Sequence, residues 1–279
     1  MKNPIYPCLW FDGNAKAAAE FYCSVFANSK ITVDTPMVVN FNLNGKKFMG
    51  LNGGSQFKFN PSVSFFAICE TENEVDSMWN KLLEGAMVMM PLDKYPWSER
   101  YGFLQDKFGV SWQVMMGNLE TMGEKIIPTF MFTGSQAGKA ELAMNFYATV
   151  FTDSKIKDIN RYVAGEHDVE GTVKHARFQL GKENFAAMDS SFPHGFEFNE
   201  AISFVVECDS QQEIDYYWNK LTEGGQESQC GWLKDKFGVS WQIVPTILGK
   251  LMTDPTKSQR VVAAFMQMKK FDIEKLVNA

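Results

Sequence analysis

The stretch Asp106-Lys-Phe-Gly-Val-Ser-Trp-Gln113 returns later in the chain as Asp235-Lys-Phe-Gly-Val-Ser-Trp-Gln242. The two copies are identical over eight residues and lie 129 positions apart in a chain of 279 residues. Self-similarity at a fixed spacing is how repeated architectures show in a sequence, so the octapeptide indicates a tandem duplication. The chain therefore contains two copies of one folding unit.

The repeat extends beyond this octapeptide. From Trp79 to Asp106 there are 27 residues, whereas from Trp218 to Asp235 there are 17. The first copy thus has ten additional residues near Met87–Trp97, which predict a longer hairpin or loop. Further matching segments support the alignment: Phe11-x-Gly13 with Phe132-x-Gly134, Glu20-Phe-Tyr22 with Asn145-Phe-Tyr147, Ser29-Lys-Ile31 with Ser154-Lys-Ile156, and Trp79-Asn-Lys-Leu82 with Trp218-Asn-Lys-Leu221.

Each copy contains the same order of elements twice. An apolar strand precedes an amphipathic helix, and in the first copy Asn14 is the predicted N-cap of that helix. Short strands follow, with Asn44-Gly45 as a hairpin turn. The second helix of each copy opens with a capping box, Thr71-x-x-Glu74 or Ser210-x-x-Glu213. The predicted fold is α+β, with four β-α-β-β-β modules.

The repeats define the expected domains. Residues 1–120 form the first domain and residues 125–248 the second, with a linker near Gly117–Lys125. Residues 249–279 form a C-terminal helical extension, in which Asp254-Pro255 marks the expected start of a helix. We expect the two copies to face each other as an internal pseudo-dimer. The sequence leaves open whether strands exchange between the copies and whether the chain forms a homodimer.

The composition is that of a soluble globular protein, with 45% hydrophobic and 22% charged residues. The net charge is −6 and the basic residues are dispersed, so we expect no nucleic-acid partner. No apolar stretch is long enough to span a membrane, so we expect no membrane partner. The start of the chain lacks the apolar core of a signal peptide, and the five cysteines show no CxxC spacing. These features predict reduced thiols and a cytoplasmic location.

Several segments form a recognisable set: Phe11-Asp-Gly-Asn14, Ala19-Glu-Phe-Tyr22, Phe198-Asn-Glu-Ala-Ile-Ser203, the long stretch Cys230–Pro245, and Arg260–Ile273. Together with the paired modules, this set resembles the glyoxalase/bleomycin-resistance/dioxygenase (vicinal oxygen chelate) superfamily. The resemblance is closest to its PhnB-like branch, whose domains are often described as 3-demethylubiquinone-9 3-methyltransferase. It covers essentially the whole chain and implies two tandem glyoxalase-like domains.

The sequence does not support methyl transfer from S-adenosylmethionine. Such chemistry usually needs a glycine-rich turn after a parallel strand, with an acidic residue that binds the ribose. The chain contains no segment of this kind, and its glycine pairs, Gly53-Gly54 and Gly224-Gly225, fit ordinary turns.

The resemblance implies where a metal site would lie, because metal-dependent members place His and Glu ligands on the first and last strands of their modules. The four expected first strands contain no His: Pro4–Phe11, Ser62–Cys69, Ile127–Phe132 and Ala201–Glu207. The last-strand Glu is replaced by Gln113 and Gln242, whose neutral amides bind hard cations more weakly than carboxylates do. No cofactor is firmly predicted, and a divalent metal remains a minor alternative.

A comparison of the two copies points to the strand Val173–Leu180. The copies differ at four aligned positions: Val38 with His175, Asn40 with Arg177, Asn42 with Gln179, and Asn52 with Asp189. A His can act as a general base near neutral pH, and an Arg can hold an oxyanion or carboxylate. We therefore predict catalytic roles for His175, Arg177 and Asp189 in a cavity of the second domain, with the first domain as a structural partner. A merely structural ion-pair cluster is the alternative.

Four more residues are predicted to contact a ligand: Gln179, Trp232, Gln242 and Cys230. An aromatic side chain at a cavity rim can stack on a planar ligand, and Cys230 could be nucleophilic only if its pKa were lowered. The sequence thus predicts a protein that binds or transforms a small molecule and leaves open whether it is an enzyme. The alternatives are a sequestering protein like the bleomycin-resistance members, or a metal-dependent lyase or dioxygenase that uses His175 and Gln242.

Overall fold

The computed structural model describes residues 3–279 and contains the four expected modules. Module one comprises β1 (Ile5–Phe11), α1 (Ala15–Val25), β2 (Lys30–Asp34), β3 (Val38–Leu43) and β4 (Lys46–Asn52). Module two comprises β5 (Val63–Cys69), α2 (Glu72–Leu82), β6 (Met87–Tyr95), β7 (Ser98–Gln105) and β8 (Ser111–Met116). These two modules make up the first sequence repeat.

The second repeat has the same order of elements. Module three comprises β9 (Ile126–Phe132), the 3₁₀ turn η1 (Gly134–Gln136), α4 (Ala140–Val150), β10 (Lys155–Arg161), β11 (Val173–Leu180) and β12 (Glu183–Asp189). Module four comprises β13 (Ile202–Cys208), α5 (Gln211–Thr222), β14 (Gln226–Glu227), β15 (Trp232–Lys234) and β16 (Ser240–Pro245). The remaining helices are α3 (Leu119–Met122) in the linker and α6 (Leu248–Thr253), α7 (Ser258–Phe265) and α8 (Ile273–Val277) in the C-terminal extension.

The strands form two eight-stranded sheets, and each sheet combines modules from both repeats. Sheet A has the order β14-β15-β16-β13-β1-β4-β3-β2, and sheet B has the order β10-β11-β12-β9-β5-β8-β7-β6. Sheet A therefore joins module one to module four, and sheet B joins module two to module three. In sheet A the two modules are connected by the antiparallel strand pair β1–β13, with Cys8 opposite Ser203. In sheet B they are connected by the antiparallel pair β5–β9, with Phe66 opposite Ile127. The structure thus answers the question of strand exchange that the sequence left open.

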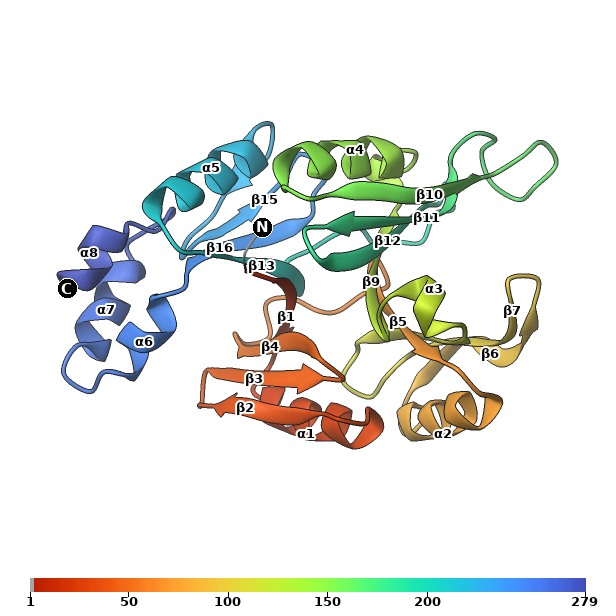
Figure 1. The fold of residues 1–279 in the computed structure, drawn as a ribbon, viewed down its shortest axis with the longest axis horizontal. Coiled ribbons are helices and arrows are strands. Elements are labelled where there is room, and N and C mark those ends of the chain that lie inside the picture. The colour runs from red at the N-terminus through yellow and green to blue at the C-terminus, as the bar shows by residue number, and fades with distance from the viewer. Residues whose placement is uncertain (1–2) are drawn as a thin grey trace.

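The helices cover the outer faces of the sheets. In Figure 1, α4 and α5 lie together on one side of the molecule and α1 and α2 lie together on the other. Sheet A packs against α1 and α5, while sheet B packs against α2 and α4. A single hydrophobic cluster between helices and sheets contains the largest buried side chains, among them Trp112 and Trp241. Each sheet keeps one face without any of these four helices, called the helix-free face below; the short linker helix α3 packs on this face of sheet B.

The repeated octapeptide forms a buried polar turn. The Oδ1 atom of Asp235 accepts hydrogen bonds from the amides of Phe237 (2.8 Å) and Val239 (3.1 Å). Its Oδ2 atom accepts from Tyr147 Oη (2.7 Å) and Trp241 Nε1 (2.8 Å). Asp106 makes the same four contacts in the first repeat, with Phe108, Val110, Tyr22 and Trp112. The octapeptide therefore ties a turn to the helix that packs over it, because a buried carboxylate needs this many donors.

Several local predictions can be compared directly with the structure. The capping boxes are confirmed: the side chains of Thr71 and Ser210 accept from the amides three residues later. The longer hairpin of the first repeat is confirmed as β6–β7. The prediction for Asn14 is wrong in one respect, because its side chain makes no capping hydrogen bond. The amide of Ala15 instead donates to Asn52 Oδ1 at 2.9 Å. The C-terminal helix α7 begins at Ser258, later than the expected Asp254-Pro255.

The C-terminal extension completes the shortened edge of sheet A. The amide of Cys230 donates to the carbonyl of Met268, and the amide of Gly231 donates to the carbonyl of Lys269, both at 2.7 Å. Phe271 packs so closely that a Cβ atom on Gly231 would lie 2.5 Å from its ring. The strands β14 and β15 are short. The C-terminal extension therefore supplies to sheet A the backbone hydrogen-bond partners that the long β6–β7 hairpin supplies to sheet B.

Candidate functional site

The residues predicted to carry function are divided between the helix-free faces of the two sheets. Along β1, Leu9 belongs to the main core, whereas Tyr6 and Cys8 belong to a separate cluster with Val205. Side chains alternate along a strand, so Tyr6, Cys8 and Trp10 share one face. The same alternation places Gln242 and Trp232 on the helix-free face of sheet A, and Ser64, Phe66, Gln113, His175 and Arg177 on that of sheet B.

These faces belong to neither repeat alone. His175 and Arg177 come from module three, but the other half of their sheet comes from module two of the first repeat. The expectation that the second repeat holds the working cavity while the first is a scaffold is therefore wrong. The physical reason is the pairing of β1 with β13 in sheet A and of β5 with β9 in sheet B, which builds each helix-free face from both copies.

The base of the sheet A face consists of neutral polar groups. Gln242 Nε2 donates to Ser203 Oγ at 2.9 Å, and Cys8 lies opposite Ser203 in the β1–β13 pair. Burial raises the pKa of the Cys8 thiol to about 12, although hydrogen bonds with Gln242 and Ser203 oppose this shift. The thiol is thus protonated near neutral pH and is a poor nucleophile.

An aromatic cluster flanks this base. Trp10, from β1, meets Phe57 edge-on at 5.1 Å between ring centroids and Trp232 edge-on at 5.8 Å. Trp10 Nε1 donates to the carbonyl of Gly54 at 2.7 Å, which fixes the orientation of the indole. Gly53 is required beside it, because a Cβ atom there would lie 2.2 Å from the Trp10 ring. All three aromatic residues are only half-buried.

The other end of the sheet A face is polar. Tyr6 Oη donates to Glu207 Oε1 at 2.8 Å, and Lys47 Nζ lies 2.7 Å from the same oxygen. Lys47 Nζ also lies 3.9 Å above the centre of the Tyr6 ring. Burial, the nearby Glu207 carboxylate and its hydrogen bond all raise the pKa of Tyr6. The equivalent positions of sheet B carry Ile127, Ile68 and Asn184.

The base of the sheet B face repeats the amide arrangement and is more heavily covered. Gln113 Nε2 donates to Ser64 Oγ at 2.9 Å, and Tyr101 Oη donates to Gln113 Oε1 at 2.7 Å. An apolar cluster built on Phe66 covers the strands. It includes side chains from the β6–β7 hairpin and from α3: Tyr101, Phe103, Met89, Met90, Leu119 and Met122. The chain itself therefore fills much of this face.

His175 lies at the margin of that apolar cluster. Its imidazole meets Phe66 edge-on, with ring centroids 6.0 Å apart. Burial lowers the pKa of His175, the Asp158 carboxylate opposes that shift, and the Arg177 guanidinium adds to it. The imidazole is therefore neutral at physiological pH. No hydrogen bond fixes its tautomer within the part of the chain that the structure describes.

Arg177 is occupied by contacts within the protein. Its Nε atom donates to Asp158 Oδ2 at 2.7 Å, and its Nη2 atom lies 2.6 Å from the same oxygen. Its Nη1 atom donates to the carbonyl of Thr121 in α3 at 3.2 Å. The guanidinium thus connects β10, β11 and α3, so its observed contacts hold α3 over sheet B.

Asp189 does not join His175 and Arg177. It lies at the end of β12 on the helix side, where Oδ1 accepts from the amide of Ala140 at 3.0 Å and Oδ2 from the amide of Val173 at 2.9 Å. Its equivalent, Asn52, makes the corresponding contact with Ala15. The grouping of Asp189 with His175 is therefore corrected, because the alternation of side chains puts them on opposite faces.

The four residues predicted to contact a ligand are also separated. Trp232 and Gln242 come together on sheet A, opposite each other in the β15–β16 pair. Gln179 lies on sheet B and donates to the carbonyl of Gly181 at 2.6 Å. Cys230 Sγ lies 3.7 Å from the carbonyl of Phe265, and burial raises the pKa of this thiol.

Sequence reasoning missed most residues of the sheet A face, among them Cys8, Trp10 and Phe57. The alternation of Tyr6, Cys8 and Trp10 along the first strand was a usable signal for Cys8 and Trp10. Phe57 had no such signal, because it reaches the face from the loop between β4 and β5.

The donor set of these faces does not fit a hard divalent metal. The first and last strands of the modules present a protonated thiol, hydroxyls and amides to these faces: Cys8, Ser203 and Gln242 on sheet A, and Thr129, Ser64 and Gln113 on sheet B. Hard divalent cations favour carboxylate ligands, and transition metals favour imidazole and thiolate ligands. Residues 3–279 contain no group of three or more His, Cys, Asp or Glu side chains arranged to hold a metal ion.

Comparison with known proteins agrees with this architecture. The described part of the chain has no helix with the length and apolarity needed to cross a membrane. Glyoxalase I from Zea mays superposes with a TM-score of 0.58, at 11% identity, over 90% of this chain and 97% of that one. The fold is therefore that of the glyoxalase-like class. At this identity the likeness concerns the fold alone.

The sequence model of the 3-demethylubiquinone-9 3-methyltransferase family matches residues 3–115 and again residues 124–244. The chain belongs to this family. A PhnB protein from Bacillus cereus with the same description is 36% identical, with a TM-score of 0.39, over 41% of this chain and all of that one. Protein PA1353 from Pseudomonas aeruginosa is 22% identical over 39% of this chain and 93% of its own, with a TM-score of 0.36. No curated protein matches the chain in a sequence comparison.

Proposed function

We propose that the protein binds an uncharged planar organic molecule on the helix-free face of sheet A and does not transfer methyl groups. The observation that carries this proposal is the half-buried aromatic cluster of Trp10, Phe57 and Trp232, whose members come from β1, a loop and β15. Aromatic rings brought together from distant segments on an accessible face are suited to stacking on a planar ligand.

The base of the face supports binding rather than reaction. The thiol of Cys8 is protonated, and Ser203 and Gln242 are neutral and hydrogen-bonded to each other. These groups can orient a ligand by hydrogen bonds, but none is an activated nucleophile. A neutral base also favours an uncharged ligand, because a buried charge without a partner costs several kcal/mol. This arrangement favours a sequestering or carrier role.

A fluorescent uncharged probe tests the proposal. N-phenyl-1-naphthylamine is expected to bind with increased emission, and Trp232→Ala should weaken binding by about 0.5–1.5 kcal/mol for the aromatic contact that is lost. Trp97→Ala is the matched control, because Trp97 is exposed on the β6–β7 hairpin and stacks only on neighbouring aromatic rings of that hairpin. Equal affinity in the native protein and Trp232→Ala would contradict the assignment of the face.

The neutral imidazole of His175 supports a second candidate, proton transfer on sheet B. This side chain is half-buried, has a lowered pKa and faces the apolar cluster around Phe66, which are properties of a general base. Titration of the imidazole by NMR should give a pKa below the ordinary value of 6.5. A ligand that binds beside His175 should shift this titration, whereas one bound to sheet A should leave it unchanged.

A further inference from the structure

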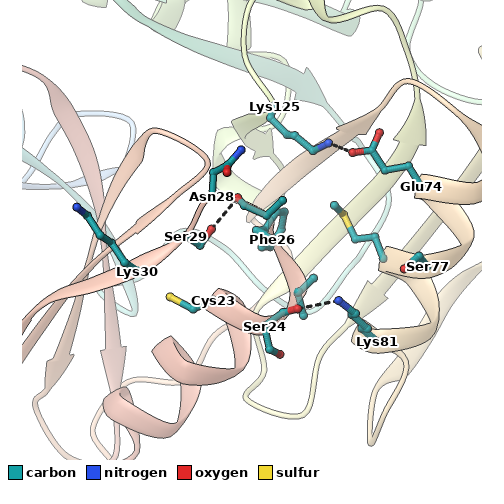
Figure 2. A pocket seen from close by; sticks show the side chains of 13 residues that line it. Cys23, Ser24, Phe26, Asn28, Ser29, Lys30, Glu74, Ser77, Lys81 and Lys125 are labelled. Atoms are coloured by element: carbon teal, nitrogen blue, oxygen red, sulfur yellow. Dashed lines mark hydrogen bonds and ion pairs between the residues drawn. The ribbon is translucent and has the colours of Figure 1, made fainter.

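A groove of about 720 Å³ lies away from both helix-free faces, between α1 and α2. It falls on the outer side of the molecule where these two helices run together (Figure 1). Its walls are the end of α1 and the following loop on one side and α2 on the other, with Lys125 at one end (Figure 2). Its volume is within the range of small-molecule sites, which run from about 300 to 1,000 Å³.

The groove has an apolar floor and a basic rim. Phe26 and Met78 are buried at its floor. Glu74 is the one carboxylate among its lining residues, and it is paired with Lys125. Lys30 and Lys81 also line the groove, and neither forms an ion pair with a carboxylate within residues 3–279. Lys81 Nζ donates one hydrogen bond across the groove, to the carbonyl of Ser24 at 2.7 Å (Figure 2). The lining therefore has an excess of two positive charges over an apolar surface.

The second repeat supplies an internal comparison. The equivalent space, between α4 and α5, is closed by Tyr216, whose Oη atom donates to the carbonyl of Val150 at 2.9 Å. Tyr217 stacks on Phe151 beside it, with ring centroids 5.3 Å apart. In the first repeat the position of Tyr216 is taken by Ser77 and that of Tyr217 by Met78. The groove is open where the first repeat has Ser77 and Met78 in place of the two tyrosines of the second repeat.

We propose that the α1–α2 groove is a binding site for a small organic anion, a molecule with an apolar body and a carboxylate, sulfonate or phosphate group. The apolar body packs on Phe26 and Met78, and the anionic group lies toward Lys30 and Lys81. The hydroxyl of Ser77 and the amide of Asn28 are available to the polar end of the ligand. This site is separate from the aromatic cluster of sheet A, so either can exist without the other.

Cys23 makes occupancy measurable, because its half-buried side chain lines the groove. The probe is 8-anilinonaphthalene-1-sulfonate, and the comparison compound is N-phenyl-1-naphthylamine, which has the same aromatic body without the sulfonate. Iodoacetamide labelling of Cys23 is followed by peptide mass spectrometry. The sulfonate is expected to slow labelling of Cys23, and the uncharged compound to leave the rate at Cys23 unchanged.

Reciprocal substitutions between the repeats sharpen the test. Ser77→Tyr should close the groove, slow the labelling of Cys23 without any probe, and abolish the effect of the sulfonate. Tyr216→Ser should open the second groove and add one probe site per chain. Both positions are exposed, so neither change disturbs the core. Lys30→Met and Lys81→Met should each weaken probe binding by up to about fivefold, the affinity equivalent of a partly exposed ion pair.

Two outcomes would overturn the proposal. One is a sulfonate that binds the native protein, by its fluorescence, while Cys23 is labelled at an unchanged rate. The other is equal protection of Cys23 by the charged and the uncharged compounds, which would show a site without preference for anions. Neither outcome affects the sheet A proposal, because that proposal depends on Trp232 and on the uncharged compound.

Discussion

The carboxylates of Asp106 and Asp235 hold four hydrogen bonds each inside the core, and this fact explains the most visible motif of the chain. Two donors are backbone amides of the following turn and two are side chains of a helix and a strand. A substitution in this set leaves a buried donor or acceptor without a partner. The aspartate and the tryptophan shared by the two octapeptides therefore meet a structural requirement of this turn.

At the scale of single residues, we predict that Asp235→Asn destabilises the protein. The amide nitrogen that replaces one oxygen cannot accept from Trp241 Nε1, and an unpaired buried donor costs about 1–3 kcal/mol. The midpoint of urea denaturation should fall with little change in its slope. Asp12→Asn is the control, since Asp12 is exposed, and it should leave the midpoint in place.

Asp235 also predicts a pH dependence of stability. Burial raises the pKa of Asp235 from 3.8 to about 6, while its hydrogen bonds oppose that shift. The pKa of Asp235 is higher in the folded state than in the unfolded state. Folding therefore takes up a proton at pH values between 3.8 and about 6. The stabilisation is complete below about pH 4 and is lost as the pH rises through about 6, and it amounts to roughly 3 kcal/mol.

The measurement is the free energy of unfolding at pH 5 and at pH 7.5, in the native protein and in Asp235→Asn. The free energy of unfolding of the native protein should exceed that of Asp235→Asn by a larger amount at pH 5 than at pH 7.5. His175 contributes with the opposite sign, because burial lowers its pKa and its stabilisation grows as the pH rises. The contribution of His175 to the free energy of unfolding is the same in both proteins, so it cancels when the variant is subtracted from the native protein. A difference that does not vary with pH would contradict the predicted titration.

At the scale of elements, the C-terminal extension replaces a hairpin. The extension pairs with Cys230 and Gly231 through backbone hydrogen bonds, and Phe271 lies over Gly231. We predict that Gly231→Ala is strongly destabilising, because its Cβ atom would lie 2.5 Å from Phe271 and 2.7 Å from the carbonyl of Ile243. Such overpacking costs about 1–3 kcal/mol beyond the backbone strain.

Gly165→Ala is a matched control for that strain. Gly165 has φ +88° and Gly231 has φ +81°, but a Cβ atom on Gly165 meets nothing within 4 Å. Both variants therefore place an alanine in the left-handed backbone region and lose stability for that reason. Only Gly231→Ala adds a steric clash. Equal losses of the two variants in a thermal denaturation experiment would contradict the predicted clash at Gly231.

At the scale of the whole molecule, an ion pair marks the pseudo-twofold axis that relates the two repeats. Lys46 and Glu183 occupy equivalent positions, and Lys46 Nζ lies 2.8 Å from Glu183 Oε2 and 2.6 Å from Glu124 Oε2. The Lys46 side chain is only 6% exposed. In a symmetric dimer of identical units a residue on the axis meets its own copy. The pair Lys46–Glu183 therefore became possible only after the two copies had diverged.

The exchange of modules predicts what happens when the linker is cut. A protease site introduced at Gly117 should allow cleavage, yet the two fragments should elute together from a gel-filtration column. Each sheet needs strands from both repeats, so separation of the fragments would expose the long antiparallel joints β1–β13 and β5–β9. The same sample in denaturant should give two bands of about half size. Two separate peaks without denaturant would contradict the observed strand order.

Much of the candidate site could be read from alternation along single strands. The sequence placed His175 and Arg177 correctly on one face of β11, and Trp232 and Gln242 share a face of sheet A. It placed Asp189 with the wrong partners, because the end of β12 lies where the strand meets the N-terminus of α4. It could not show that Arg177 holds α3, since that contact joins residues that are 56 positions apart.

The sequence by itself determined the duplication and the order of elements in each module. These depend on hydrogen bonds and periodicity within short segments, which local residues specify. Only the tertiary structure decided which modules share a sheet. The first strands of all modules are similarly apolar, so their pairing depends on contacts between residues as far apart as Cys8 and Ser203. The same long-range packing decided that one groove is open and its counterpart closed.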